Sequence, residues 1–288
     1  YIVDLILGEN RMNFNKQKRF FIGGGFIGGT VILGVAAWNY AFAGATAPNE
    51  LEYLPKKEAT AKPSNPSVSS VVAKDGVLSF NFEAETVGAA PKTFVPVVGN
   101  WIVGQDVNNK VLVVDGRAWS KGQTASGIAE RARSLYGERY AEFLDNVQAF
   151  AYYPYALANG VEDFRNGTIT LKFKGIDGRI DQAAGILFNA KANGDYLAIR
   201  ANPLENNLVL WKFERGKRTS EKWVKNVVTP SKEWHELKLI ISGAKIEGYV
   251  NGKLYLEYTL PKEVSGKIGI WSKADSVVYY DDYTVYLK

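Results

Sequence analysis

The stretch YVNGKLY, residues 249–255, predicts a β-hairpin. Its central pair, Asn251-Gly252, suits a type I′ turn, because both residues of that turn must adopt a positive φ angle. The residues on either side are mostly aromatic, β-branched or aliphatic, as is typical of strands. We therefore expect two antiparallel strands, at residues 245–250 and 254–258, joined by a tight turn.

Outward from this hairpin, the same pattern fills residues 76–288. Short segments rich in Val, Ile, Tyr, Phe and Trp alternate with Gly, Asn, Asp and Pro, which indicates strands separated by turns. So many short strands predict a mainly β fold, a two-sheet antiparallel jelly-roll sandwich. The other expected strands are residues 77–82, 101–105, 111–115, 168–174, 185–190, 196–201, 208–213, 223–227, 235–241, 267–271 and 278–287.

One stretch, at about residues 119–149, departs from this pattern. Between Ser126 and Ala149, apolar residues recur at helical spacing with charged residues between them, which predicts a short helical insertion. The centre of its apolar stripe would either cover the protein's own sheet or dock a partner, and the sequence leaves both open. The residues at this centre are Tyr136, Tyr140, Phe143 and Leu144.

An uncharged run precedes the β region. Residues 20–49 contain no charged side chain, and four basic residues lie between residues 11 and 19. A membrane-spanning helix needs about 20 apolar residues, so the run is long enough for an anchor. The tripeptide Ala41-Phe42-Ala43 also fits the cleavage site of a secretory signal. We take the uncleaved anchor as the working hypothesis.

This hypothesis divides the chain into four parts. Residues 1–19 form a cytoplasmic segment, residues 20–45 a transmembrane helix, residues 46–75 a linker, and residues 76–288 a sandwich on the periplasmic or extracellular side of the inner membrane. Four glycines in the helix have the spacing that allows two membrane helices to pack closely, although membrane helices also simply tolerate glycine. They are Gly24, Gly25, Gly28 and Gly29.

Composition limits the chemistry. The chain has no cysteine, which excludes disulfides, thiolate nucleophiles and cysteine-ligated metals. Its one histidine, His235, opens an expected strand and is predicted to be structural rather than a lone general base. Acidic and basic residues nearly balance beyond residue 76, so we expect no nucleic-acid partner.

Three segments carry a resemblance to a known family. They are GRIDQAAGILFNAKANGDYLAIRANPLENNLVLWKFERGKR (178–218), EWHELKLIISGAKIEGYVNGKLYLEYT (233–259) and GKIGIWSKADSVVYYDDYTVY (266–286). The chain resembles the laminin-G-like, concanavalin A-type jelly-roll domains of bacteria, which are described as family-16-glycoside-hydrolase-like or grouped with the 3-keto-disaccharide hydrolase domain. The resemblance covers most of residues 77–288 and implies the sandwich fold. It is a poor guide to activity, because this fold serves lectins, hydrolases and adhesion modules.

The resemblance also implies a candidate calcium site. Many sandwiches of this type hold a structural Ca²⁺ with one acid near the first strand and another in the last strand. Glu83 matches the first place and Asp282 the second, with Asp281 as the alternative. Oxygen ligands suit Ca²⁺, but two surface carboxylates without a metal explain the sequence equally well.

Aromatic residues supply a candidate carbohydrate site. Tyr196, Trp211, Trp223 and Trp271 are predicted to form a platform on which sugar rings stack, with Asn206 beside it to bind hydroxyl groups; Asn207 and Asp195 are further polar candidates. The alternative is that these aromatic side chains only fill the core of the sandwich.

No catalytic residues are predicted. Family-16 hydrolases place their carboxylates in an E-x-D-x-x-E motif, which this sequence lacks. The adjacent acids Glu162-Asp163 and Asp281-Asp282 would point to opposite faces of a strand, which does not suit an acid and base that act on one bond. The sequence therefore favours a protein that is not an enzyme and needs no cofactor apart from the candidate structural Ca²⁺.

Two functions remain open. The first is a non-catalytic accessory or scaffolding subunit of a larger inner-membrane complex, which contacts other membrane subunits through its helix and its outer domain. The alternative is a membrane-tethered carbohydrate-binding module or a degenerate glycoside hydrolase. The glycine-rich helix and the insertion favour the subunit, whereas the fold favours the glycan-binding alternative.

Overall fold

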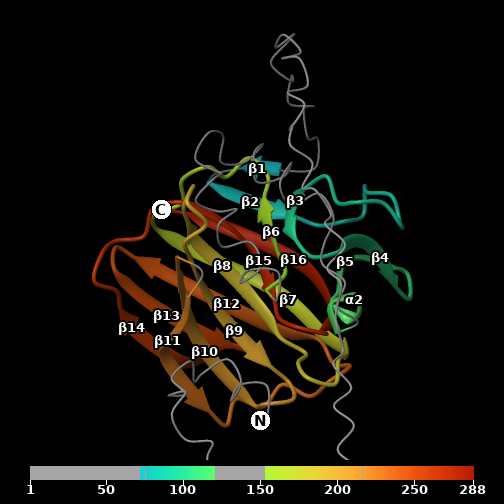
Figure 1. Ribbon diagram of the computed structural model, residues 1–288. Helices are drawn as coiled ribbons and strands as arrows, with labels where there is room; N and C mark the ends of the chain where they lie inside the picture. Colours follow the sequence, from blue (N-terminus) through green and yellow to red (C-terminus); the bar gives the residue numbers. More distant parts are fainter. Residues whose placement is uncertain (1–71, 75, 121–152, 216) are drawn as a thin grey trace, which may run out of the picture. The chain divides into compact units, whose positions relative to one another are not determined.

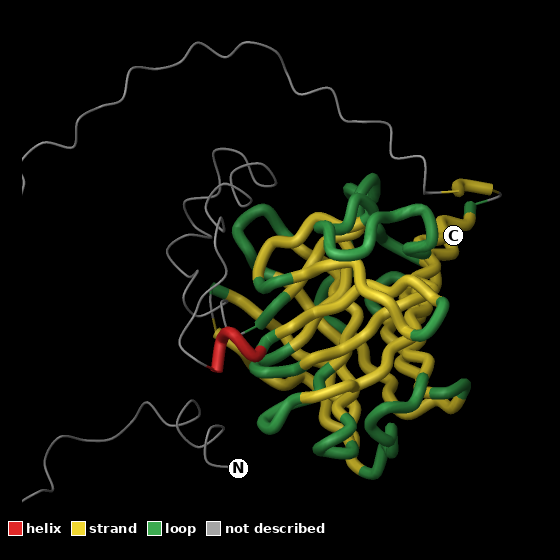
Figure 2. The backbone as a smooth tube through the Cα atoms, turned by 90° about the vertical axis from the view of Figure 1, so that its right-hand side faces the viewer, coloured by secondary structure: helices red, strands yellow, loops and turns green. Residues whose placement is uncertain are grey.

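The described part of the chain folds into a β-sandwich of two antiparallel sheets (Figure 1). The computed structural model describes residues 72–74, 76–120, 153–215 and 217–288. Within these ranges the chain forms sixteen strands and one helical turn, α2 (Arg117–Ser120). Figure 2 shows the same composition from the side, with strands and loops throughout and the short helix at one end.

The first sheet has nine strands. Its central order is β1 (Val72–Lys74), β2 (Val77–Phe80), β16 (Val277–Leu287), β7 (Gly167–Asp177), β12 (His235–Ser242), β13 (Lys245–Val250) and β14 (Lys253–Thr259). β5 (Asn109–Asp115) also pairs with β16 and carries β4 (Trp101–Asp106) at its other side.

The second sheet has seven strands. Their order is β11 (Lys217–Lys225), β10 (Asn207–Glu214), β9 (Tyr196–Asn202), β8 (Ala184–Ala190), β15 (Lys267–Ser272), β6 (Tyr155–Ala158) and β3 (Phe94–Val98). β11 is therefore the strand at one edge of this sheet, and β9 and β10 lie next to it.

The core lies between the sheets. Alternate residues of the strands point inward, among them Ile199 and Leu208 from the seven-stranded sheet and Leu239 and Tyr283 from the nine-stranded sheet. The sheets approach so closely at Gly248 of β13 that a Cβ atom there would lie 2.2 Å from Cδ1 of Ile199. Any larger residue at this position would force the Ile199 side chain to move.

The hairpin prediction is confirmed. β13 and β14 are antiparallel, and Asn251 and Gly252 between them have φ angles of 49° and 78°. The two-sheet antiparallel sandwich is confirmed as well, and most of the expected strands lie within a few residues of their predicted bounds.

Some elements differ from the prediction. The strand expected at residues 223–227 is β11, Lys217–Lys225, whose first half is too polar to be recognised as a strand. It forms because an edge strand pairs on one side only and tolerates exposed polar side chains. The sequence analysis also missed β3 and β6, which are short, and β1, which lies within the expected linker.

Several predictions fall outside the described residues. They concern the segment at 1–19, the anchor at 20–45 with Gly24, Gly25, Gly28 and Gly29, most of the linker at 46–75, and the insertion residues Tyr136, Tyr140, Phe143 and Leu144. None of the helical structure described here has the length and apolar character required to cross a bilayer.

Candidate functional site

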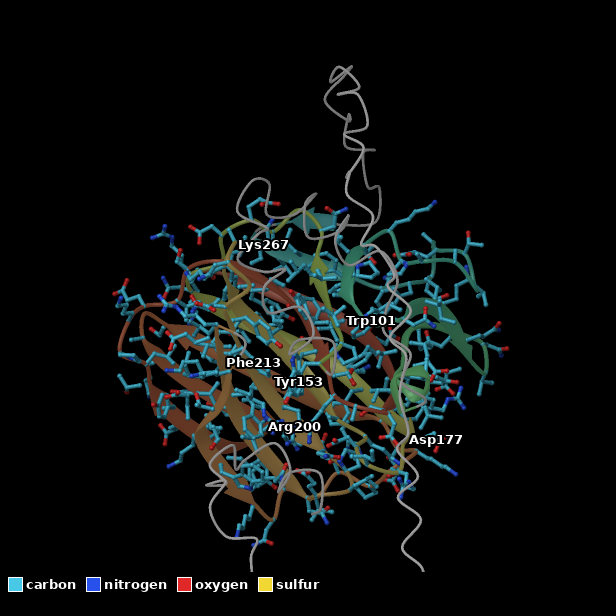
Figure 3. The ribbon with its side chains drawn as sticks, viewed as in Figure 1. Trp101, Tyr153, Asp177, Arg200, Phe213 and Lys267 are labelled. Carbon is cyan, nitrogen blue, oxygen red and sulfur yellow. The ribbon has the colours of Figure 1, made fainter. Side chains whose placement is uncertain are left out.

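The outer face of the seven-stranded sheet carries a second apolar cluster, separate from the core. On β9 and β10 every residue facing this side is buried. Tyr196 stacks on Phe213 with ring centroids 4.3 Å apart, and Tyr153 stacks on Trp271 at 5.8 Å. Figure 3 shows the labelled Tyr153 and Phe213 together over this sheet.

The predicted aromatic residues come together on this face. Nε1 of Trp271 donates to the hydroxyl of Tyr196 at 3.1 Å. Trp211 meets Trp223 edge to face, with ring centroids 5.5 Å apart and ring planes at 82°. Trp271, Tyr196 and Trp211 are buried, whereas Trp223 on the edge strand is 43% exposed. The four side chains thus form one aromatic cluster that is open at Trp223.

A buried arginine lies beside this cluster. Arg200 projects from β9 and is only 1% exposed, near Phe213 and Tyr153 in Figure 3. Its Nη1 donates to Oε2 of Glu205 at 3.0 Å and to Oδ1 of Asn207 at 2.6 Å. The guanidinium also lies 5.7 Å from the centroid of the Trp211 ring. Arg200 therefore connects the aromatic cluster to a charged one.

The charged cluster contains a second ion pair. Nζ of Lys273 lies 3.0 Å from Oδ2 of Asp181, and both side chains are almost completely buried. Nδ2 of Asn202 donates to Oδ1 of Asp181 at 2.7 Å. The carboxylate of Asp275 accepts hydrogen bonds from the backbone N–H groups of residues 179, 180 and 181 and thereby fixes the loop that carries Asp181.

The two carboxyl groups of this cluster titrate differently. Burial raises the pKa of Asp181, and the charges of Lys273 and Arg200 oppose this effect only in part. Burial alone would also raise the pKa of Glu205, but the charge of Arg200 and the hydrogen bond from Asn207 lower it on balance. Opposite shifts in neighbouring carboxyl groups are common at functional sites.

Two buried donors beside the cluster have no acceptor in the part of the chain that the structure describes. Among the described residues, Nε of Arg200 and Nε1 of Trp211 are both buried and form no hydrogen bond. A buried donor without a partner costs about 1–3 kcal/mol, so two of them side by side need an explanation. A ligand that supplies hydrogen-bond acceptors at this point would provide one.

Two of the three predicted polar residues lie away from the cluster. Asn206 is exposed and occupies the turn between β9 and β10 with a φ angle of 48°. Asp195 accepts a hydrogen bond from the backbone N–H of Arg215 at 2.8 Å and so fixes a loop. Of the three candidates, the structure places only Asn207 in the cluster, where it contacts Arg200.

The sequence analysis missed most of the charged cluster, namely Arg200, Glu205, Asp181, Lys273 and Asn202. One signal was available for Arg200. In YLAIRAN it stands four residues after Tyr196, so strand alternation puts both side chains on the same face. The remaining members come from loops and strand ends, which carry no such periodicity.

The three calcium candidates do not form a fitting site. Glu83 accepts a hydrogen bond from the backbone N–H of Lys110 at 3.0 Å, and Asp281 accepts one at 2.7 Å from a side-chain amide on β5. Asp282 pairs with Nζ of Lys172 at 2.7 Å, which puts an ammonium group where a cation would bind. In the part of the chain that the structure describes, no three His, Cys, Asp or Glu side chains are grouped to hold a metal.

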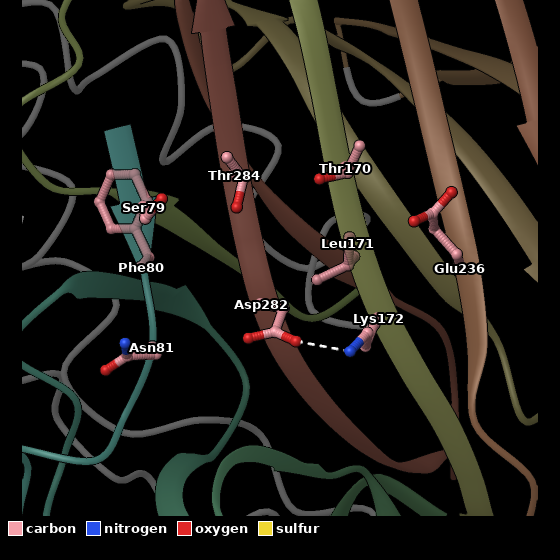
Figure 4. Close-up of a pocket in the computed structure, with 9 residues that line it drawn as sticks. All are labelled: Ser79, Phe80, Asn81, Thr170, Leu171, Lys172, Glu236, Asp282 and Thr284. Atoms are coloured by element: carbon pink, nitrogen blue, oxygen red, sulfur yellow. Dashed lines mark ion pairs between the residues drawn. The ribbon is translucent and has the colours of Figure 1, made fainter. Parts of the chain in front are cut away.

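Asp282 lines a hollow of about 350 Å³ over the nine-stranded sheet (Figure 4). The strand β16 bulges against β7 at this point, and Asp282 and Lys172 form an ion pair across the hollow. Thr170, Thr284 and Glu236 supply further polar groups. Polar side chains are normal on the solvent side of an antiparallel sheet, and no aromatic ring is exposed in the hollow. The outer face of the seven-stranded sheet is therefore the stronger candidate.

His235 has a structural place, as the sequence suggested. Its Nε2 lies 2.9 Å from the carbonyl oxygen of Pro230, and its Nδ1 lies 3.1 Å from Nδ2 of Asn251 in the hairpin turn. Both ring nitrogens are engaged within the protein, so the histidine connects the start of β12 to that turn.

The described residues form a two-sheet antiparallel β-sandwich. Residues 55–285 match the family described as the 3-keto-alpha-glucoside-1,2-lyase-like domain, and the chain belongs to that family. This match confirms the resemblance to 3-keto-disaccharide hydrolase domains. A comparison with curated proteins found no match.

Three of the solved structures that are similar to this chain are described here. The carbohydrate binding module CBM66 from Bacillus subtilis is 13% identical, with a TM-score of 0.47, and the alignment covers 69% of this chain and 98% of that chain. A Bacillus subtilis protein of unknown function with a galectin-like fold is 14% identical, with a TM-score of 0.45 and coverages of 70% and 97%. The Crh5 transglycosylase is 10% identical, with a TM-score of 0.45 and coverages of 76% and 87%.

Proposed function

We propose that this protein binds a glycoside at the outer face of its seven-stranded sheet. The observation that carries the proposal is the pair of buried, unpartnered donors, Nε of Arg200 and Nε1 of Trp211, within an aromatic cluster. A sugar offers hydroxyl and ring oxygens as acceptors and an apolar C–H face for contact with aromatic rings. It therefore satisfies both features of the site at once.

The charges of the site favour a neutral ligand. Arg200 is paired with Glu205, and Lys273 is paired with Asp181, so each buried charge already has a counterion. Hydrogen bonding to uncharged hydroxyl groups requires no further charge compensation. The family to which the chain belongs makes α-glucosides and 3-keto-α-glucosides the first ligands to test.

Trp211→Phe tests the proposal, because it removes one donor and keeps an aromatic ring. The purified 288-residue chain is titrated with methyl α-glucoside and methyl 3-keto-α-glucoside by isothermal titration calorimetry. We expect one of them to bind the parent chain, and the variant to bind it about 2- to 10-fold more weakly, the effect of one hydrogen bond. Trp271→Phe is the control, because Nε1 of Trp271 already donates within the protein.

Absence of binding to both glucosides contradicts the proposal for this ligand class. Equal affinity of the parent chain and the Trp211→Phe variant contradicts the role assigned to the indole donor. An equal loss in both tryptophan variants would show that the aromatic packing of the face matters and that the free donor does not.

A second candidate is cleavage of the bound glycoside. Asp181 and Glu205, whose pKa values are shifted in opposite directions, resemble an acid and a base in one site. A 1,2-elimination from a 3-ketoglycoside would need a base to remove the proton on C2 and an acid to protonate the departing glycosidic oxygen. We keep non-catalytic binding as the main proposal, because each carboxylate is held in an ion pair.

One assay distinguishes glycoside binding from glycoside cleavage. The chain is incubated with methyl 3-keto-α-glucoside, and formation of the conjugated enone is followed by ultraviolet absorbance. Turnover that is abolished by Asp181→Asn and by Glu205→Gln would establish the enzyme. Unchanged substrate in the presence of measurable binding supports the non-catalytic proposal.

The role of accessory subunit in a membrane complex stays a prediction. It depends on Gly24, Gly25, Gly28 and Gly29 and on the insertion, all of which lie outside the described residues. Native gel electrophoresis of detergent-solubilised membranes tests it together with the predicted inner-membrane location. Migration with defined partners that Gly28→Leu disrupts would support the subunit, because leucine adds bulk at a close helix contact.

A further inference from the structure

We infer that His235 and Asn251 form an acid-sensitive contact, which holds the turn of the β13–β14 hairpin against the start of β12 while the imidazole is neutral and weakens when it is protonated. The inference goes beyond the proposed function and does not depend on it, because His235 belongs to the nine-stranded sheet. The chain has one histidine, so its protonation can be followed without interference from others.

The hydrogen bonds around the ring determine its tautomer. The backbone N–H of Glu236 donates to Oδ1 of Asn251 at 2.9 Å, which leaves the Nδ2 amide group of Asn251 toward the ring. An amide nitrogen only donates, so Nδ1 of His235, 3.1 Å away, accepts. Nε2 lies 2.9 Å from the carbonyl oxygen of Pro230, which only accepts, so Nε2 carries the proton. These partners fit the neutral imidazole.

Protonation disrupts this arrangement. An imidazolium carries a proton on both nitrogens, so the N–H at Nδ1 would face the N–H groups of Asn251. If the amide turned to offer its oxygen to the ring, the backbone N–H of Glu236 would lose its acceptor. In both cases one hydrogen bond is lost, and the ring, which is 5% exposed, has little access to water in its place. Acid therefore weakens the contact between the hairpin turn and β12.

The groups that touch the ring do not compensate an added charge. The ring packs against Phe173 of β7 with ring centroids 5.4 Å apart. Its other partners are the carbonyl oxygen of Pro230 and the amide of Asn251. Among the described residues, none of the groups that make these contacts is charged.

The charged and titratable side chains of the surrounding elements are directed elsewhere. Strand alternation turns Lys172 and Lys174 of β7 and Glu236 of β12 to the outer face of the sheet. There the two lysines pair with carboxylates, and Glu236 lines the hollow. The remaining groups are exposed or, for the tyrosine, hydrogen-bonded in the core: Lys232, Glu233, Lys253 and Tyr280. In the part of the chain that the structure describes, no carboxylate is therefore placed to stabilise an imidazolium here.

The stability of the full chain at two pH values tests the inference. Urea denaturation followed by tryptophan fluorescence is carried out at about pH 7.5 and about pH 5.5, between which histidine ordinarily gains its proton. His235→Asn is the reference, because its amide oxygen replaces Nδ1 as an acceptor and does not titrate. Relative to this reference, we expect acidification to raise the equilibrium constant for unfolding of the parent chain about 2- to 10-fold, the effect of one hydrogen bond.

Asn251→Asp should reverse the sign of this change. Its carboxylate has one oxygen for the backbone N–H of Glu236 and a second for the ring, so it stabilises the imidazolium. Aspartate also suits the positive φ angle of this turn, which is 49°. Acidification should therefore lower the equilibrium constant for unfolding of Asn251→Asp, relative to the double variant that also carries His235→Asn.

NMR of the parent chain labelled with 15N-histidine measures the tautomer directly and needs no variant to fold. A proton on Nε2 at about pH 7.5, together with the reversal of sign in Asn251→Asp, would establish the acid-sensitive contact. A proton on Nδ1 would overturn the inference. The same pH dependence in the parent chain and in His235→Asn would overturn it too, and so would a change of equal sign in the parent chain and in Asn251→Asp.

Discussion

Tyr280 and Tyr283 of β16 are both completely buried, but their hydroxyl groups differ. The hydroxyl of Tyr280 donates to the carbonyl oxygen of Trp271 at 3.1 Å. Among the described residues, the hydroxyl of Tyr283 has no hydrogen-bond partner. Removal of the oxygen by substitution with phenylalanine should therefore have opposite effects at these two positions of one strand.

The magnitude follows from the cost of burying an unpaired hydroxyl, which is about 1–3 kcal/mol. Tyr283→Phe relieves this cost but leaves a small void among Phe80, Phe94 and the neighbouring residues, worth up to about 1 kcal/mol. We expect a net stabilisation of about 1–2 kcal/mol, which corresponds to about 2–8 °C in Tm for a domain of this size. Tyr280→Phe should destabilise the domain by about 0.5–1.5 kcal/mol, the value of one hydrogen bond.

Urea denaturation followed by tryptophan fluorescence measures both changes, and an unchanged m-value would confirm that only stability differs. Each variant is the control for the other, because both lose one hydroxyl oxygen from a buried tyrosine of β16. A destabilised Tyr283→Phe variant would refute the reasoning, since it would mean that the hydroxyl has a partner. Shifts of equal sign and size would show that loss of packing dominates at both positions.

Three further outcomes are expected. The lowered pKa of Glu205 means that its carboxylate stabilises the fold above the usual glutamate range, and this contribution is lost as the pH falls through the folded-state pKa. Glu205→Gln should therefore flatten the loss of stability below about pH 4.5, as acid titrations followed by circular dichroism would show, and an unchanged acid profile would contradict this. Gly248→Ala should cost about 1–3 kcal/mol in urea denaturation, because its Cβ would overlap Ile199 in the core, and a neutral result would show that the sheets separate easily. Calcium chloride and EDTA should leave Tm unchanged, because a lysine occupies the cation position beside Asp282, whereas a calcium-dependent rise in Tm would establish a site.

The fold was predictable because its signals are local. Asn251-Gly252 determines a turn type by itself, and the alternation in the flanking strands determines which residues face the core. β11 was harder to place, because a polar edge strand has no alternation and is formed only by pairing with β10. A bulge between Leu210 and Trp211 also shifts the register between β10 and β11, and no residue type in the sequence predicts this bulge.

The candidate site was predictable in its aromatic part and in Asn207. Tyr196, Trp211 and Trp223 lie on three consecutive strands with outward positions, so strand alternation brings them to one face. The charged residues come from segments that are far apart in the sequence. Asp181 and Lys273 are 92 residues apart in sequence and meet because their loops are fixed by other residues, among them Asp275. Such pairing depends on tertiary structure and is not visible in a single sequence.

The energetics of the charged cluster point to function. Burial of an ion pair is rarely the most stable solution, and apolar replacements of similar volume are often equally stable or more stable. The Lys273–Asp181 pair is buried, and the buried Arg200 pairs with the partly exposed Glu205. Among the described residues, Nε of Arg200 and Nε1 of Trp211 beside them have no acceptor. Packing alone would be better served by apolar side chains, which the rest of the face already uses. Under the proposed function, a ligand that completes these hydrogen bonds would offset the cost that the polar groups impose on the stability of the unliganded chain.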